Sequence, residues 1–422
     1  MTTRTKRIGK ILAIVVAVIA ALYLGLTVWS FVALHRAYAA LARDGRPMTA
    51  AEVIPPPVPA AENAAPLYEE AFRLLKAEKL GDSTLLEKLS LAARDAAATN
   101  ATPADVTRFR ELVTRPAAQH ALDLVVQAGE RKSCRFDLDY ASPLGVTCSN
   151  MVDLFAMCRI IRGEVSRRVN AGENSNAWHL AIAGLGLAQA QQAEPFLFSQ
   201  LTTIYLEAIA DASVCRLCTA AFPTHEQSDC ALAALSRMDH PADFQRMLDG
   251  ERLLLFEQEF AHTTREGVCQ TLTMAEVPSW EQNIYQCAWR TLWRLDHAAY
   301  LHVLRIMAST PLSRNMPPLQ IPRYCFCTRS LLPTLDDCRT NFTAHLARIR
   351  CTEAGLSALV YKKEHGAWPE TLASCMAQVP GDPFADKPLR YRVTEKGFVV
   401  SSVGKIRNTK EIAWEYEPDN VR

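Results

Sequence analysis

The chain has 422 residues, of which 49% are hydrophobic and 22% are charged, a composition typical of folded proteins rather than disordered ones. Its 46 basic and 45 acidic residues nearly cancel, leaving a formal net charge of +1. Nucleic-acid-binding domains usually concentrate basic charge, so this balance argues against a nucleic-acid partner. At roughly 100–200 residues per domain, the length predicts two or three structural units.

An uncharged apolar run, ILAIVVAVIAALYLGLTVWSFVAL, occupies residues 11–34. As a helix rising ~1.5 Å per residue, it is long enough to cross a hydrocarbon core of ~30 Å. Tyr23 and Trp29 are residue types enriched at membrane–water interfaces. A cleaved signal peptide is the alternative, because AYA at residues 37–39 resembles a cleavage site. The run exceeds the usual apolar length of ~7–15 residues, which favours a retained anchor.

The orientation of this helix follows from the charges on its two sides. Four basic residues precede the run, Arg4, Lys6, Arg7 and Lys10, and three follow it, Arg36, Arg43 and Arg46, with Asp44 between them. The positive-inside rule, together with the short N-terminus and the many cysteines, favours a cytoplasmic segment at residues 1–10. The prediction is therefore a single-pass protein of the cell inner membrane with its bulk in the periplasm.

The segment after the anchor is rich in proline. Residues 46–66 contain six prolines, and we predict an extended, semi-rigid linker over residues 35–62. Helical periodicity then dominates residues 63–350, with prolines between the runs. Thr102 is an expected N-cap, and Pro103 suits the first helical position. Without a fixed-period repeat, we expect a multi-helix bundle or an irregular helical array.

All 13 cysteines lie from Cys134 onward. In an oxidising compartment this number predicts disulfides, and the odd count leaves at least one cysteine outside an intrachain bridge. The connectivity stays open, with Cys351–Cys375 as one plausible pair. Cys215 and Cys218 have the C-x-x-C spacing of zinc sites and dithiol oxidoreductases, but they sit late in a helical run. We therefore favour a disulfide or buried thiols over zinc or redox chemistry.

A few further clusters of side chains are candidate sites. Glu259, His262 and Glu266 would share one face of a continuous helix, but a solvated face is the simpler reading. The arginine cluster at residues 159, 162, 167 and 168 is likewise interpreted as a solvated helix face. His297 and His302 are five residues apart and diverge on a helix. The stripe of Tyr285, Trp289, Trp293 and Tyr300 predicts core packing, with a partner-binding face as the alternative.

The common catalytic signatures are absent from the sequence, including G-x-S-x-G, the P-loop, G-x-G-x-x-G and H-E-x-x-H. We assign no catalytic, cofactor-binding or metal-binding residue and expect no cofactor.

The C-terminal region changes character. Alternating residues in LRYRVT predict a strand at residues 389–394, followed by a turn at 395–397 and a returning strand at 398–402. Together with the preceding helix, this order resembles the C-terminal half of the G-type pseudopilins of type II secretion systems. The resemblance covers residues 361–404 and rests on Tyr361, Gly366, Pro369, Leu372, Pro380, Asp382, Pro383, Phe384, Tyr391, Ser402 and Gly404.

This resemblance implies a small αβ module at residues 351–405, followed by a tail at 406–422. In the pseudopilins, acidic residues after the S-x-G motif help to bind calcium. Here Lys405, Ile406 and Arg407 follow the motif, so calcium binding is not carried over. The pseudopilins also join the membrane helix directly to the module, whereas a long helical region intervenes here. The chain is therefore not expected to be a pilin subunit.

The wider layout, including NAAPLYEEA at residues 63–71, resembles membrane-anchored helical proteins of planctomycete-type bacteria, a group that brings no activity to transfer. The predicted fold is thus mostly α, with an anchor helix, a helical body and a small αβ module. The predicted function is an extracytoplasmic scaffold or interaction protein whose partners are the membrane and other envelope proteins. An envelope enzyme, either a metal-dependent hydrolase or a dithiol oxidoreductase, is the alternative.

Overall fold

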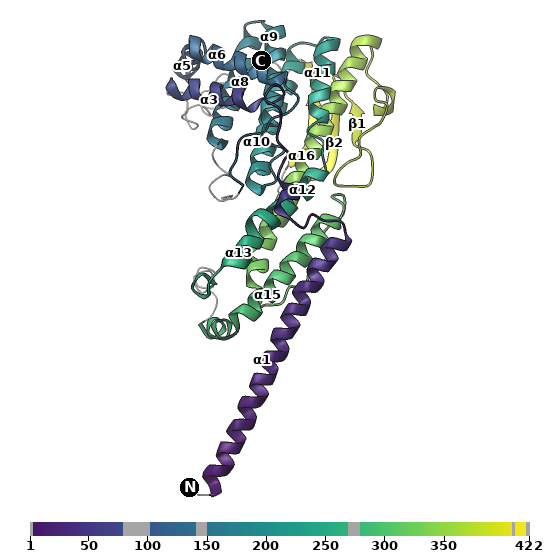
Figure 1. The fold of residues 1–422 in the computed structure, drawn as a ribbon. Helices are drawn as coiled ribbons and strands as arrows, with labels where there is room; N and C mark the ends of the chain where they lie inside the picture. Colours follow the sequence, from purple (N-terminus) through teal and green to yellow (C-terminus); the bar gives the residue numbers. More distant parts are fainter. Residues whose placement is uncertain (1–2, 79–101, 141–149, 269–278, 407–409, 419–422) are drawn as a thin grey trace. The chain divides into compact units, whose positions relative to one another are not determined.

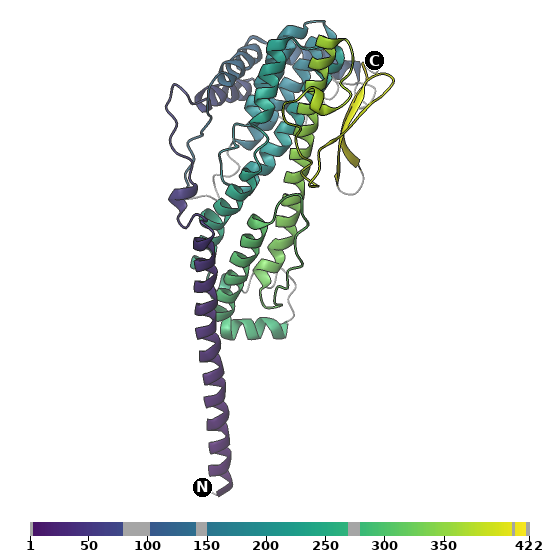
Figure 2. The same ribbon diagram turned by 90° about the vertical axis from the view of Figure 1, so that its right-hand side faces the viewer.

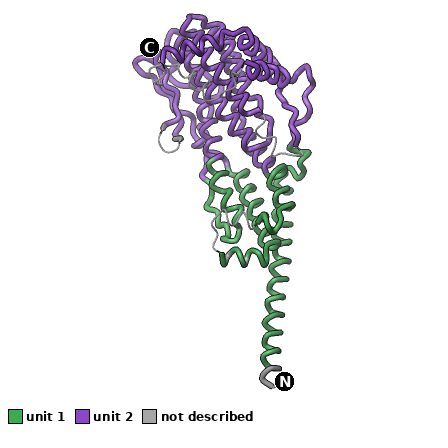
Figure 3. Tube along the Cα trace, turned by 90° about the vertical axis from the view of Figure 1, so that its left-hand side faces the viewer, with its two compact units in different colours: residues 1–53, 252–310, 316–337 green, residues 54–251, 311–315, 338–422 purple. Residues whose placement is uncertain are grey.

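A computed structural model of the full chain describes residues 3–78, 102–140, 150–268, 279–406 and 410–418 (Figure 1). The described residues are mostly helical and end in a small antiparallel sheet, as the sequence predicts. They form two compact units, coloured separately in Figure 3. Unit 1 comprises residues 1–53, 252–310 and 316–337, and unit 2 comprises residues 54–251, 311–315 and 338–422. These units do not follow the predicted divisions at residues 62 and 350.

Unit 1 is built around two long helices, α1 (Thr3–Arg43) and α15 (Ser279–Ser309), which pack against each other. The shorter elements are α2 (Ala50–Val53), most of the π-helical turn η1 (Glu251–Phe256), α13 (Glu257–His262) and the first part of α16 (Phe326–His365). The helix α1 extends beyond the predicted anchor to Arg43. Part of the range expected to be a proline-rich linker is therefore helical.

The aromatic side chains of α13 and α15 form the centre of unit 1. Phe260 stacks on His297 with ring centroids 4.2 Å apart, and it also contacts Trp293 and Tyr300. The indole nitrogen of Trp293 donates a hydrogen bond to the carbonyl of Phe260. Burying a tryptophan with its N–H satisfied removes apolar area from water without leaving an unpaired donor.

Unit 2 contains a helical body of eight described helices, and the apolar faces of the first seven share one core. These helices are α3 (Ala65–Ala77), α5 (Pro103–Val113), α6 (Pro116–Gly129), α8 (Met151–Asn170), α9 (Asn174–Ala188), α10 (Leu197–Ala220), α11 (His225–Ser236) and α12 (Ala242–Gly250). Helix α9 packs against α6, α8, α10 and α11. Small residues bring α6 and α9 close together: a Cβ atom at Gly129 would lie 3.5 Å from the Cα of Ala183, and one at Gly186 would lie 3.6 Å from the Cα of Gly129.

Local sequence signals determine where several of these helices begin. Thr102 caps α5 through a capping box, in which its hydroxyl accepts from the Asp105 backbone and Asp105 accepts from the Thr102 backbone. Pro103 follows at the first position, so the predicted start is confirmed. Helix α10 lacks a side-chain cap at Phe196, but buried Glu251 accepts from the Leu197 backbone nitrogen at 2.6 Å. A carboxylate is favourable there because the helix N-terminus carries partial positive charge.

The sheet has three strands in the order β1 (Arg390–Val393), β2 (Phe398–Ile406) and β3 (Lys410–Tyr416), all antiparallel. Val393 pairs with Phe398, which confirms the predicted hairpin. The third strand lies in the range expected to be a tail. Before the sheet, α16 ends at His365, and the next residue, Gly366, has a φ of +73°, the left-handed conformation that glycine adopts without strain. A short 3-10 turn, η2 (Leu372–Ser374), follows.

The last part of α16 covers one face of the sheet through a close contact at Gly355. A Cβ atom at this position would lie 2.0 Å from the ring of Trp414. Beside it, Phe398 stacks on Tyr416 at 5.3 Å and meets Trp414 and Trp368 edge-on. The sheet is thus attached to the helical body by an aromatic core.

Candidate functional site

The most unusual surface of the described residues is the N-terminal part of α1. Every residue from 8 to 26 is exposed, including Ile11, Ile19 and Leu22 at 62%, 60% and 69%. These 19 positions extend over about 28 Å of helix, close to the thickness of a hydrocarbon core. Among the described residues, α1 is the one helix that is long and apolar enough to cross a membrane, a test that a signal sequence also passes.

The C-terminal part of α1 is instead an integral helix of unit 1. Its contact with α15 begins at Thr27, whose hydroxyl lies 3.2 Å from that of Thr291. Ser30 is fully buried, and Leu41 is 2% exposed. Asp44, directly after the helix, forms a salt bridge with Arg305. The apolar run predicted at residues 11–34 therefore divides into an exposed part and a packed part.

Cys215 and Cys218 lie on the last turns of α10 and face the core of unit 2. Cys218 is 1% exposed, and the Sγ atom of Cys215 lies 3.8 Å from the hydroxyl of Thr352. Burial, reinforced by the nearby Asp211, raises the pKa of both thiols well above the usual value. A dithiol catalyst needs an accessible thiolate, and this environment opposes one.

The expected disulfides are not formed within the described residues. Cys351 and Cys375 are separate thiols, so the pair considered from the sequence is not bridged. Cys351 is buried on α16, where burial raises its pKa to about 12, while Cys375 donates to the carbonyl of Leu372. Cys148 and Cys269 lie outside the described residues. The other described cysteines are not disulfide-bonded either: Cys134, Cys158, Cys215, Cys218, Cys230, Cys287, Cys325, Cys327 and Cys338.

Glu259, His262 and Glu266 do not share a helix face. Helix α13 ends at His262, because Thr263 adopts an extended conformation with ψ of 132°. Glu266 therefore belongs to a separate turn, and all three side chains are exposed. No group of three or more histidine, cysteine, aspartate or glutamate side chains suited to a metal ion occurs among the residues that the structure describes.

The arginine cluster on α8 is not a solvated face. Glu164 is completely buried and accepts hydrogen bonds from Arg167 and Arg168, both at 2.7 Å. Arg162 is only 7% exposed, and Arg159 lies over the ring of Phe155. The sequence interpretation missed Glu164, which lies one turn from each paired arginine and turns the cluster into a buried ion network.

The aromatic stripe of α15 is mainly core, as expected. Tyr285, Trp293 and Tyr300 are 5%, 7% and 0% exposed. Trp289 is half-buried, and its ring lies 5.3 Å from the guanidinium of Arg290. The two histidines of α15 diverge, as predicted: His302 is exposed, whereas His297 is 7% exposed and stacks on Phe260.

A buried polar pair between α10 and α16 had no signal in the sequence. His345 lies 2.8 Å from Glu207, and each side chain is 2% exposed. One turn further along α10, burial raises the pKa of Asp211 to about 6. The partners are 138 positions apart, so only the packing of the two helices brings them together. Because both side chains are buried, neither solvent nor a substrate reaches them, and their contact joins α10 to α16.

Asp382 organises the loop before the sheet. Its carboxylate is 3% exposed and accepts from the Phe384 and Val403 backbones and from the Ser402 hydroxyl, at 2.7–2.9 Å. A Cβ atom at Gly404 would lie 2.2 Å from the Phe384 ring. The D-P-aromatic and S-x-G segments singled out in the sequence therefore contact each other directly.

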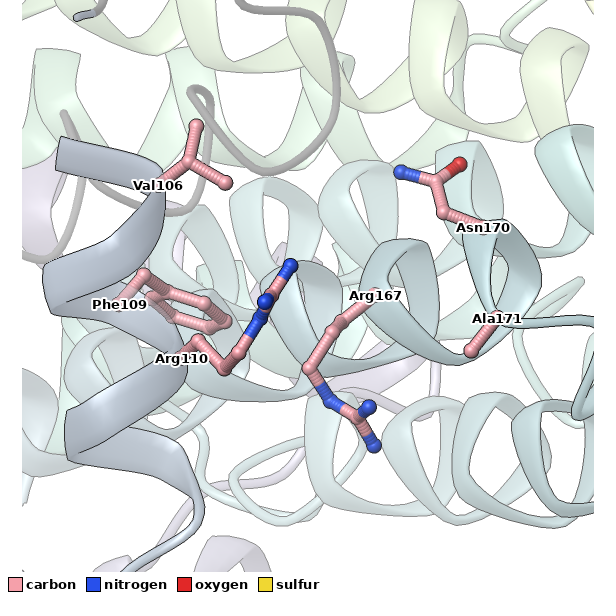
Figure 4. A pocket seen from close by; sticks show the side chains of 6 residues that line it. All are labelled: Val106, Phe109, Arg110, Arg167, Asn170 and Ala171. Carbon is pink, nitrogen blue, oxygen red and sulfur yellow. The ribbon is translucent and has the colours of Figure 1, made fainter. Parts of the chain in front are cut away.

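The surface of unit 2 has cavities among its described residues. One, of about 410 Å³, lies between α5 and α8 and is lined by Val106, Phe109, Arg110, Arg167, Asn170 and Ala171 (Figure 4). Its two guanidinium groups suit an anion, but Arg167 is already paired with Glu164. Another, of about 440 Å³, lies beside α11, α16 and η2, where Tyr361 stacks on His365.

Comparison with known proteins returned no match to any family model, curated protein or solved structure.

Proposed function

We propose that this chain is a single-pass, membrane-anchored scaffold or interaction protein of the cell envelope, with its bulk on the extracytoplasmic side. The observation that carries the proposal is the division of α1 into an exposed apolar part and a packed part. Residues 11–26 offer apolar side chains on all sides of the helix, which is favourable in lipid and costly in water.

The packed part of α1 supports an anchor over a signal peptide. Cleavage after Ala39 would remove Thr27, Ser30 and Tyr38, all of which contact α15. The loss of Ser30 and its neighbours would leave one face of α15 uncovered. A signal peptide that is discarded has no reason to complete a folded unit, whereas a retained anchor that continues into the unit fixes it to the membrane.

The C-terminal module fits the interaction role. Its pseudopilin-like order of helix, D-P-aromatic loop and strands remains part of the proposal, in which the module serves for docking. The enzyme alternative gains no support from its two candidate sites. The thiols of Cys215 and Cys218 are buried with raised pKa values, and Glu259, His262 and Glu266 are split across a helix break.

The test is expression of the full chain, tagged at its C-terminus, in a bacterium with two membranes. We expect the protein in the membrane pellet after alkaline carbonate extraction, with an intact mass that retains residues 1–39. Protease added to spheroplasts should degrade the tag. Ile19→Arg combined with Leu22→Arg should prevent membrane integration, whereas His35→Arg, at an exposed position beyond the apolar part, should not. A mature chain that begins after Ala39 would contradict the anchor.

A further inference from the structure

Helix α15 has a sharp bend near its beginning. Ala288 has φ of −122° and ψ of 22°, which is outside the helical region. Figure 2 shows the segment before this bend, residues 279–287, lying across the direction of α1 rather than alongside it. After the bend, α15 follows α1 in the same direction, from the contact between Thr27 and Thr291 to the salt bridge between Asp44 and Arg305.

These contacts determine the level of the bend along α1. Thr291 is three residues beyond Ala288, and it meets α1 at Thr27. The transverse segment therefore lies near the end of the exposed apolar part, residues 8–26. If that part crosses the hydrocarbon core, the transverse segment reaches the level of the lipid headgroups. A helix that lies across the membrane normal at this depth has the orientation of an interfacial helix.

The side chains at this level suit an interface. Trp280 is 62% exposed on the transverse segment, and Trp29 is 56% exposed on α1. Tyr285 is only 5% exposed and packs the transverse segment against the rest of unit 1. Exposed tryptophans are costly in water, but they are favoured at the boundary between hydrocarbon and headgroups.

Two arginines accompany these aromatic residues. Arg294 lies over the ring of Phe31 with its guanidinium carbon 3.9 Å from the centroid, and it donates to the Ser30 hydroxyl at 3.3 Å. Arg290 is exposed one turn earlier, beside Trp289. Burial and the charge of Arg290 lower the pKa of Arg294. No carboxylate of the described residues forms a salt bridge with either arginine, so two like charges stand together without a counter-ion from that part of the chain.

We propose that residues 279–294 form a headgroup platform that binds the phosphate of an anionic phospholipid through Arg290 and Arg294, with Trp280 and Trp289 at the interface. Planar guanidinium groups hold phosphate oxygens in paired hydrogen bonds, and basic residues near an anionic leaflet strengthen binding to it. The platform rests on the proposed anchoring, because α1 brings it to the membrane. The ligand is a lipid, since the site adjoins the exposed apolar helix.

The test uses the full chain in mild detergent, with phosphatidylglycerol or phosphatidylcholine added and bound lipid counted by native mass spectrometry. We expect preferential retention of phosphatidylglycerol by the wild-type chain and a loss of roughly tenfold in that preference in Arg290→Gln/Arg294→Gln. Arg290→Gln alone should show part of the loss, since its exposed side chain is dispensable for folding. The matched control is Arg36→Gln/Arg43→Gln, which removes two charges from α1 beyond the platform and should leave the preference unchanged.

The outcomes separate the platform from the anchor. Equal retention of the two lipids, or an unchanged preference in the double variant, would overturn the platform even if carbonate extraction leaves the chain in the membrane. Displacement of the lipid by inorganic phosphate would also overturn it, because it would indicate a site for free anions. A cross-link from Trp280, replaced by a photoreactive residue, to an envelope protein instead of lipid would reassign the surface to a protein partner. A chain released by carbonate would refute the anchor itself.

Discussion

His297 is a histidine held in its neutral form inside unit 1. Its ring stacks on Phe260 and lies edge-on to Tyr38, and burial, reinforced by the charge of Arg252, lowers its pKa to about 4. The folded state therefore binds this proton less readily than the unfolded state, whose histidine titrates near 6.5. At pH above 6.5 both states are neutral, and His297 contributes no pH dependence.

Acidification should destabilise unit 1 through this residue. Between pH 6.5 and 4 the unfolded state is protonated first, so the free energy of unfolding should fall by up to about 3 kcal/mol, and the loss should level off below pH 4. The measurement is the thermal midpoint of the full chain in detergent across this range. His297→Phe should show a smaller decrease than the wild type. The exposed His302→Phe should follow the wild type; parallel curves for all three proteins would refute the buried-histidine account.

The thiols of α10 offer a second test at this scale. With burial opposing their ionisation, Cys215 and Cys218 should resist iodoacetamide at neutral pH and react only after denaturation. Cys230 is exposed on α11 and should react in the native protein. Peptide mass spectrometry after timed labelling distinguishes the three sites. Rapid native labelling of Cys215 or Cys218 would instead support the dithiol oxidoreductase alternative.

Residue roles could be predicted where the signal is local. The cap at Thr102 depends on neighbours within one turn, and the prediction is confirmed. The contacts of Glu164 with Arg167 and Arg168 are also local, but a run of charged residues does not show that Glu164 is buried. The pair of Glu207 and His345 depends on two helices meeting, so one sequence carries no trace of it. The cavity between α5 and α8 likewise depends on how two helices pack, so the sequence alone does not reveal it.

Among the elements, α16 and the sheet depend on the absence of a side chain at Gly355. Alanine there would place a methyl group 2.0 Å from the Trp414 ring, inside a packed aromatic core. Gly355→Ala should therefore destabilise unit 2 by about 1–3 kcal/mol, despite the better helix propensity of alanine.

Gly186 on α9 supplies the control for this prediction. The nearest atom to a Cβ at Gly186 is 3.6 Å away, an ordinary contact. Gly186→Ala should be neutral or stabilise the protein by up to about 1 kcal/mol. Urea unfolding followed by far-ultraviolet circular dichroism compares the two variants. Equal midpoints would show that α16 and the sheet adjust freely at this contact.

Elements with a clear period were predictable, and those without one were not. Alternation in residues 389–394 and the following turn gave the β1–β2 hairpin correctly. The third strand, with Ile412, Trp414 and Tyr416 on its buried face, was read as a tail because it comes after the resemblance ends. The bend at Ala288 lies in a helix that contains no proline or glycine, so no local signal in the sequence predicts it.

At the scale of the whole molecule, α1 consists of an exposed part and a part that packs within unit 1. Residues 8–26 contact no other part of the described chain closely enough to be buried, whereas the helix from Thr27 onward completes unit 1. The sequence predicted a membrane anchor at residues 11–34 from its uncharged run, and the exposed part of α1 is compatible with one. The sequence could not show that the rest of the helix packs within unit 1, because apolar residues are favourable both in lipid and in a protein core. In the structure, the boundary between the exposed part and the packed part lies near Leu26.

Two truncated chains test this division. A chain of residues 27–422 keeps the packed part of α1 and should retain unit 1, whereas a chain of residues 44–422 loses Ser30, Tyr38 and Leu41 and uncovers one face of α15. In mild detergent, hydrogen exchange at residues 291–304 should be slow in the first chain and much faster in the second, because amides in a helix without its packing partner open locally. Equal protection in both chains would mean that α15 does not need α1. In that case cleavage at residues 37–39 would carry no structural penalty, and the argument for a retained anchor would lose its main support.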